Sequence, residues 1–135
     1  MRDWNKKTIS ELRENEGKVG GMFEGAPLLL LHHKGARTGT DRVSPMMYQS
    51  VDGGYAVFAS KAGADTNPDW LHNLKANPET RVEVDTEFVR VRARVVDGPE
   101  YDRIWSTQKM RYPTFAEYER KTSRDHIPVV VLEIV

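Results

Sequence analysis

The sequence contains no cysteine among its 135 residues. Disulfides, thiolate metal sites and iron–sulfur clusters are therefore excluded, and the composition is compatible with a reducing cytoplasm. Excess charge of one sign is also absent, because 20 lysines and arginines balance 20 aspartates and glutamates. Without a net positive field, the chain has no general means of attracting nucleic acid, so any anion-binding site has to be local.

Long hydrophobic runs are missing as well. The N-terminus, MRDWNKKTISELRENEG, carries charges throughout and has no apolar core of signal-peptide length, and no later run approaches the roughly 20 residues of a membrane span. We therefore expect a cytoplasmic protein, and contact of the N-terminal segment with a membrane surface stays open. The length predicts a single domain over residues 1–135, which is large enough to bury roughly two-thirds of its unfolded surface.

The first half of the chain predicts a short amphipathic helix, three strands and a second helix. Charged and apolar residues alternate with approximate helical spacing over residues 3–16, before a run of glycines. Apolar segments joined by turn sequences predict antiparallel strands at 27–33, 42–51 and 55–60. The stretch NPDWLHNLKANP predicts a helix with Asn67 as N-cap, Pro68 at its first position and an end before the second proline.

The second half predicts another hairpin, two helices and a last buried strand. Residues 81–84 and 88–96 alternate around the turn DTE, and the second strand carries arginines on one face, namely Arg90, Arg92 and Arg94. Pro113 divides the next segment into two helices, and IPVVVLEIV closes the chain as a strand. This order predicts an α+β protein with a small, mostly antiparallel β-barrel and helices packed outside it, although the pattern alone does not separate a barrel from a sandwich.

Several kinds of catalytic site find no support in the sequence. The four histidines, His32, His33, His72 and His126, lack the spacing of metal ligands, so we expect no metal. No G-x-S-x-G elbow surrounds a serine, and neither a G-x-G-x-x-G fingerprint nor a P-loop is present. Serine hydrolases, Rossmann dehydrogenases and kinase-type phosphate sites are therefore not indicated.

Two glycine- and alanine-rich turns at strand ends carry a cation each. In KGARTGTDR the glycines suit a tight hairpin, but such a turn has no need of an arginine. The sequence ASKAGA places Lys61 in a similar setting, and backbone N–H groups beside a cation suit phosphate or carboxylate. The nine residues of the first turn alone favour a plain hairpin, whereas the two turns together suggest a ligand with several acidic groups. Trp70, on the next helix, suits either the core or a planar ring.

These motifs, taken in order, resemble the deazaflavin-dependent nitroreductase family, the actinobacterial quinone and nitro reductases that use reduced coenzyme F420. The resemblance covers nearly the whole chain, through DWNKKTISELRENEGKVGGMFEGAPLLLLH, GARTG, RVSPMMY, FASKAGADTNPDWLHNLKANP, RYPTFAEYERKTSR and IPVVVLEIV. It implies a split β-barrel of about six strands, coenzyme F420 as cofactor, and an oxidoreductase that passes a hydride to a quinone, nitro or activated-ene acceptor.

The resemblance also implies a set of cofactor-binding residues. The phosphate and polyglutamate tail would lie against the first turn, at Arg37, Thr38, Gly39 and Arg42. The ring would be bordered by Pro45 and Met47, by the second turn at Ala59, Ser60, Lys61 and Ala62, and by Trp70 and Asn73 on the helix.

The tyrosines near the C-terminus match those that shape the substrate pocket in the family. They are Tyr112 and Tyr118, while the middle position holds Phe115, which has no hydroxyl to donate. A hydroxyl such as that of Ser60 or Tyr118 could stabilise or protonate the oxyanion that forms on the acceptor. The lead-in HHKG departs from the threonine-rich sequence common in the family, and no function is attached to His32 or His33.

Two other hypotheses compete with this one. The first is an FMN- or haem-binding split barrel of similar shape. The second is a small non-catalytic barrel that binds nucleic acid or another acidic ligand through the arginine face, which the balanced charge disfavours. The physiological acceptor, the proton donor and the oligomeric state are not determined by the sequence.

Overall fold

The computed structural model describes residues 9–10 and 27–135. Its strands are β1 (Leu28–Lys34), β2 (Asp41–Val51), β3 (Gly54–Phe58), β4 (Glu79–Val84), β5 (Glu87–Val95) and β6 (Val129–Ile134). Its helices are α2 (Asp69–Ala76), α3 (Gly98–Arg111) and α4 (Thr114–Lys121), with a short 3-10 turn, η2 (Lys61–Gly63). Within these residues no helix combines the length and the apolar character that crossing a membrane requires. The helix expected over residues 3–16 lies outside the described residues, apart from Ile9 and Ser10, which are helical.

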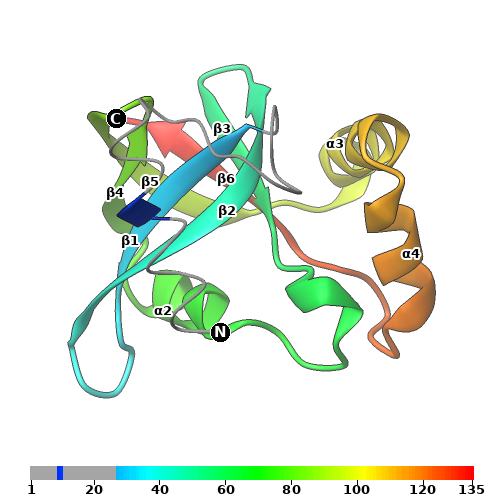
Figure 1. Cartoon of the computed structure of the whole chain (residues 1–135), viewed down its shortest axis with the longest axis horizontal. Helices are drawn as coiled ribbons and strands as arrows, with labels where there is room; N and C mark the ends of the chain where they lie inside the picture. Colours follow the sequence, from blue (N-terminus) through cyan, green and yellow to red (C-terminus); the bar gives the residue numbers. More distant parts are fainter. Residues whose placement is uncertain (1–8, 11–26) are drawn as a thin grey trace.

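The six strands form a closed antiparallel barrel in the order β1-β2-β3-β6-β5-β4 (Figure 1). The last strand closes it, because β6 pairs with β3 on one side and with β5 on the other. At Gly54 the two backbones approach so closely that an added Cβ would lie 2.1 Å from the Leu132 carbonyl oxygen. The barrel expected from the sequence is therefore confirmed over the sandwich.

Alternation along the strands divides the apolar side chains between two clusters. One joins alternate strand residues such as Leu29, Leu31 and Leu132 with Leu71 and Leu74 of α2, so that this helix caps one end of the barrel. The other lies on the outer face of β3 and β6, where α3 and α4 pack against Phe58 and Val131. Figure 1 shows α2 at one end of the barrel and the α3–α4 pair at its side.

Three details differ from the sequence-based expectations. Helix α2 begins at Asp69 with Pro68 as its N-cap residue, and Asn67 is not the cap because its Oδ1 accepts a hydrogen bond from Arg124. Strand β3 ends at Phe58, since Ala59 and Ser60 already belong to the turn. Val95 falls on the apolar side of the alternation in β5, opposite the arginines, but it is 47% exposed, because β4 pairs with β5 only as far as Arg92 while Val95 still pairs with Val130 of β6.

The arginine face of β5 is exposed to solvent and forms surface ion pairs. Arg94 donates to Glu100 and Glu133 with N–O distances of 2.7 Å, and Arg92 lies 3.4 Å from Glu79. All three arginines of this face are exposed. Exposed pairs of this kind contribute at most about 1 kcal/mol to stability.

Candidate functional site

The loop between β1 and β2 is held in shape by its own hydrogen bonds. The N–H of Gly35 donates to the Thr40 carbonyl at 2.9 Å, and the N–H of Gly39 donates to the Gly35 carbonyl at 2.8 Å. The hydroxyl of Thr38 accepts from the Thr40 N–H, and Gly39 has a φ of 70°, which glycine adopts without strain. Arg37 and Thr38 are therefore carried on a defined turn.

This loop and the first turns of α2 enclose a cavity of about 570 Å³. It brings together four of the residues assigned to the cofactor from the sequence, namely Arg37, Thr38, Arg42 and Asn73. Asp69 and His72 of α2 complete its wall. Neither Arg37 nor Arg42 forms an ion pair with any described residue, so both guanidinium groups are available to an anion.

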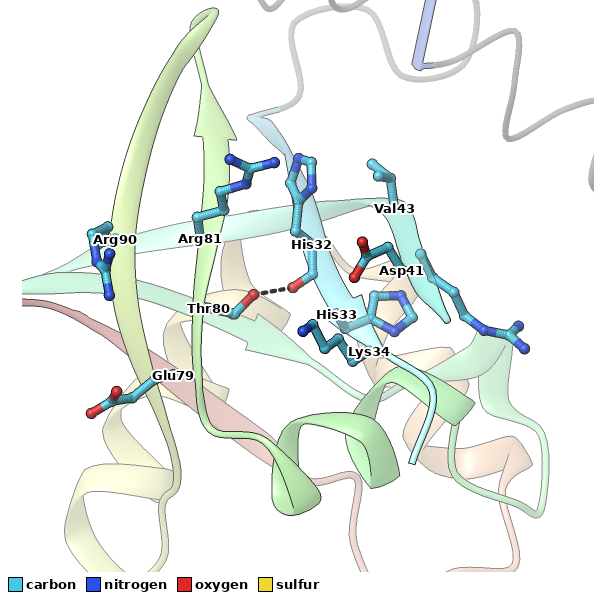
Figure 2. A pocket seen from close by; sticks show the side chains of 10 residues that line it. His32, His33, Lys34, Asp41, Val43, Glu79, Thr80, Arg81 and Arg90 are labelled. Atoms are coloured by element: carbon cyan, nitrogen blue, oxygen red, sulfur yellow. Dashed lines mark hydrogen bonds between the residues drawn. The ribbon is translucent and has the colours of Figure 1, made fainter. Parts of the chain in front are cut away.

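Figure 2 shows a second cavity, of about 550 Å³. Arg42 lines both this cavity and the first one. The second cavity exists because β1 and β4 pair only at Leu30–Glu83 and Leu31–Val82 and then diverge. The Thr80 hydroxyl bridges the gap by donating to the His32 carbonyl at 2.6 Å. Its further cations are Lys34, Arg81 and Arg90, and its carboxylates are Asp41 and Glu79. Local sequence patterns contain no sign of this cavity, because it lies between residues such as His32 and Thr80, which are 48 positions apart.

The second predicted turn, ASKAGA, has an unusual backbone. Lys61, Ala62 and Gly63 follow one another with φ values of 47°, 54° and 80°, and the first two are residues that rarely adopt this region. The N–H of Gly63 donates to the Ser60 carbonyl and that of Ala64 to the Lys61 carbonyl. The N–H groups of Lys61 and Ala62 have no acceptor in the part of the chain that the structure describes. Backbone strain of this kind concentrates at functional sites.

Arg124 holds this turn in place, and the sequence did not single it out. Its Nη1 donates to the Ala59 carbonyl and to Asn67 Oδ1, and its Nη2 donates to the Ser60 carbonyl, each at 2.8 Å. Its Nε donates to the Thr122 hydroxyl at 2.9 Å. Helix α4 adds further support, because an added Cβ on Gly63 would lie 3.1 Å from Lys121 Cβ and from the Tyr118 carbonyl oxygen. One guanidinium therefore joins the turn, the approach to α2 and the end of α4.

Only some of the residues assigned to the ring and the acceptor lie on the outer face of the barrel, because Ala59 and Trp70 belong to the interior cluster. Pro45 and Met47 are neighbours on one face of β2, paired with Leu30 and Leu28. Met47, Tyr112 and Tyr118 are partly buried against the cluster beneath α3 and α4. Phe115 is 7% exposed and lies edge-on to Tyr118, with ring centroids 5.5 Å apart. Phe115 is therefore a packing residue, while both tyrosines keep part of their surface accessible.

Trp70 and Asn73 share a face of α2 but have different surroundings. Trp70 is partly buried against the interior cluster. Asn73 is 6% exposed, and its amide is bonded on both sides, to the Ala36 N–H and to His33. Asn73 therefore connects α2 to the loop that carries Arg37.

Among the described residues, no three His, Asp or Glu side chains gather closely enough to hold a metal ion. The donors present suit an organic anion with a planar ring instead. Guanidinium groups line one cavity, strained backbone N–H groups lie at the second turn, and apolar and aromatic side chains flank that turn.

Comparison with known proteins agrees with this chemistry. A family model described as F420H(2)-dependent quinone reductase matches residues 4–134. The F420H(2)-dependent quinone reductase Rv1261c of Mycobacterium tuberculosis is 38% identical over 124 residues, which cover 89% of this chain and 83% of that protein. The putative F420H(2)-dependent quinone reductase Rv3178 of the same species is 33% identical over 112 residues, covering 83% of this chain and 93% of that protein.

Solved structures show the same fold. A structure described as an F420-H2 dependent reductase (FDR-A) is 35% identical with a TM-score of 0.69, covering 78% of this chain and 93% of that one. Another, described as a domain-swapped dimer, is 33% identical with a TM-score of 0.73 over 98% of both chains. The haem storage protein HutZ of Vibrio cholerae has a TM-score of 0.62 over 96% of this chain and 89% of that one, but at 16% identity it shows a shared fold alone.

Proposed function

Since the chain belongs to the F420H(2)-dependent quinone reductase family, it is an F420H2-dependent oxidoreductase, and we propose that its two strand-end turns hold the cofactor while a quinone lies over the ring. This placement rests on two features of the structure, a cavity lined by arginines without ion-pair partners among the described residues and a turn with a strained backbone. The cavity is joined to α2 through Asn73, and the turn is joined through Arg124 to Asn67, which precedes α2.

The acidic end of F420 suits the cavity beside the β1–β2 loop. Arg37 and Arg42 offer guanidinium donors that no described carboxylate occupies, and they match phosphate and carboxylate oxygens in geometry. Arg42 also lines the second cavity, where Lys34 adds another cation. The negative Asp69 on the rim disfavours a strongly anionic group close to α2 and so directs the anion towards the arginines.

The ring of the cofactor suits the surface between the second turn and β2. The N–H groups of Lys61 and Ala62 are available to its polar edge, and Pro45 and Met47 offer apolar surface to its face. Tyr112 and Tyr118 extend this surface from α3 and α4. The bound F420 supplies a two-electron hydride carrier, and the chain supplies placement and electrostatics.

The chain's own contribution to the reaction is orientation and proton supply. Aromatic and apolar side chains position a flat acceptor against the ring and exclude water from it. When the acceptor oxygen gains negative charge, a hydroxyl from Tyr118 or Ser60 donates a hydrogen bond or a proton to it. A nitro group or an activated ene presents a similar site for charge, so we propose these acceptors alongside quinones.

The proposal is tested by titration of the purified protein with F420, FMN and haem. We expect F420 to bind with a dissociation constant in the micromolar range or below, which corresponds to roughly 8 kcal/mol or more, and FMN to bind much more weakly. Reduced F420 should then be oxidised when a quinone is added. Equal or tighter binding of FMN or haem, with no oxidation of reduced F420, would contradict the proposal.

The tyrosine hydroxyls should matter for turnover more than for cofactor affinity. Tyr118→Phe and Tyr112→Phe each remove one hydroxyl while keeping the ring that packs against the outer cluster. If one of them is the proton donor, its variant should lower kcat by about 10²- to 10⁴-fold, the range for a general acid, with the dissociation constant of F420 changed little. Steady-state kinetics at saturating cofactor measure the first quantity and titration the second. A weakened affinity with unchanged kcat would place the tyrosines elsewhere.

A further inference from the structure

A chain of hydrogen bonds leads from the barrel wall to the β1–β2 loop through a buried histidine. His33 Nε2 lies 2.9 Å from the Ser44 hydroxyl on β2, and His33 Nδ1 lies 2.9 Å from Asn73 Nδ2 on α2. Asn73 Oδ1 in turn accepts from the Ala36 N–H at 2.9 Å. His33 and Asn73 are each 6% exposed, so little water competes for these bonds.

The donor at the loop end of this series of hydrogen bonds determines which atoms of Asn73 and His33 carry protons. A backbone N–H can only donate, so the Asn73 atom that faces Ala36 must be the carbonyl oxygen. The amide nitrogen of Asn73 therefore faces His33, and His33 Nδ1 must accept from it. The ring proton is then on Nε2 and is donated to the Ser44 hydroxyl. Only a neutral His33 in this tautomer satisfies every partner.

The Ala36 contact sets the position of the whole loop. Gly35, Thr38, Gly39 and Thr40 are bonded to one another, so the turn moves as a unit. Among the described residues, no other hydrogen bond joins residues 35–40 to α2. A displacement of Asn73 would therefore move Arg37 relative to the cavity that it lines.

We propose that His33 is a positioning residue, which orients the Asn73 amide so that Asn73 holds the β1–β2 loop and Arg37 in the geometry that binds the acidic end of F420. This role rests on the proposed function of the loop. It gives a role to His33, to which the sequence alone assigned none.

The charges around His33 agree with a neutral ring. Burial, followed by the positive charge of Arg42 on β2 and by His32 on β1, lowers the pKa of His33 from 6.5 to about 4, against the weaker opposing effect of Asp69 on α2. Thr80 and Glu79 of β4 line the second cavity together with His33. Because the unfolded chain takes up a proton below about pH 6.5 and folded His33 does so only near pH 4, His33 opposes folding increasingly as the pH falls through this range.

Two substitutions of nearly equal size separate positioning from simple packing. His33→Leu removes the acceptor at the Nδ1 position, whereas His33→Asn keeps a carbonyl oxygen near that place. We expect His33→Leu to raise the dissociation constant of F420 about tenfold, which corresponds to the free energy of one hydrogen bond that orders the loop. The kcat at saturating cofactor should be nearly unchanged. His33→Asn should recover most of the affinity. Equal losses in both variants, or no loss in either, would overturn the proposal.

A matched control removes a part-buried hydrogen bond that lies outside both cavities. Tyr101→Phe deletes the donation from the Tyr101 hydroxyl to the Ile127 carbonyl and keeps the aromatic ring. We expect this variant to unfold at lower urea concentration while its affinity for F420 stays within about twofold of the wild type. An affinity loss as large as that of His33→Leu would show that general destabilisation is responsible and would overturn the proposal.

Nuclear magnetic resonance tests the relay, which is the series of hydrogen bonds from Ser44 through His33 and Asn73 to Ala36, without any cofactor. The ¹⁵N shifts of His33 should report the Nε2–H tautomer, and the Ala36 amide should be protected from exchange in the wild type and in His33→Asn but not in His33→Leu. Asn73→Asp should raise the pKa of His33 by about one unit or more, because a carboxylate favours the imidazolium. An Nδ1–H tautomer in the wild type would overturn the proposal. If the relay is observed but F420 does not bind the wild type, the proposed function fails and the positioning role fails with it.

Discussion

Replacing Arg124 by alanine is expected to abolish most of the reductase activity and to lower stability by about 3 kcal/mol. The variant loses hydrogen bonds to the Ala59 and Ser60 carbonyls, to Asn67 and to Thr122. Hydrogen bonds to a charged group contribute roughly 1.5 to 3 kcal/mol each when desolvated, and the partial exposure of Arg124 reduces the sum. Ala59 is fully buried, so water cannot readily replace the guanidinium at its carbonyl.

The loss of activity should exceed what the loss of stability explains. Lys61 and Ala62 are held at positive φ, a conformation that costs of order 1 kcal/mol or more for each residue. Without Arg124 the turn can relax to a less strained backbone, which would turn its free N–H groups away from the proposed ring site. Urea unfolding measures stability, and F420 titration and quinone turnover measure function on the same folded sample.

The controls for Arg124 follow from its geometry. Arg124→Lys keeps the charge but cannot reach acceptors on three sides, so it should resemble alanine more than the wild type. Arg120→Ala removes an exposed cation from the last turn of α4 that has no hydrogen-bond partner among the described residues, and it should change little. If folded Arg124→Ala turned over quinone at the wild-type rate, the hydrogen bonds from Arg124 to the second turn would not be needed for the reaction.

Replacing Arg37 and Arg42 together by alanine is expected to weaken F420 binding by roughly 3 to 6 kcal/mol if the two act independently. Each single change should cost about 1.5 to 3 kcal/mol, the value of a hydrogen bond to a charged group. Both side chains are exposed and without ion-pair partners in the described parts of the chain, so the free energy of unfolding should stay within about 0.5 kcal/mol of the wild type.

The two single variants can be distinguished by salt and by ligand. Arg42 lines both cavities whereas Arg37 lines only one, so Arg42→Ala should lose more affinity when the cofactor carries a longer acidic tail. Binding by the wild type should weaken with added salt, and the double variant should show a smaller salt dependence. Arg103→Ala on the exposed side of α3 is the matched control. Unchanged affinity in the double variant would show that KGARTGTDR is a plain hairpin turn with no role in cofactor binding.

Much of the fold was predictable from local pattern. The apolar segments of β1 to β3, the alternation in β4 and β5, the break at Pro113 and the turn at Asp52 depend on residues within a few positions of one another, and the structure confirms them. Side-chain periodicity of two or 3.6 is a property of the backbone itself, so it survives whatever the chain packs against. The order of the motifs in turn predicted the family, which the family model confirms.

The site depended on contacts that no local pattern contains. Arg124 reaches Ala59 across 65 positions and His33 reaches Asn73 across 40, and both contacts exist only because the closed barrel brings those segments to one end. Asn67 shows the consequence most clearly. Its sequence is that of an N-cap, but the distant guanidinium takes its oxygen and the helix begins later. The sequence by itself determined which segments become strands and helices, whereas the partner of each polar side chain was decided by barrel closure, because a hydrogen bond depends on proximity in space and not on separation along the chain.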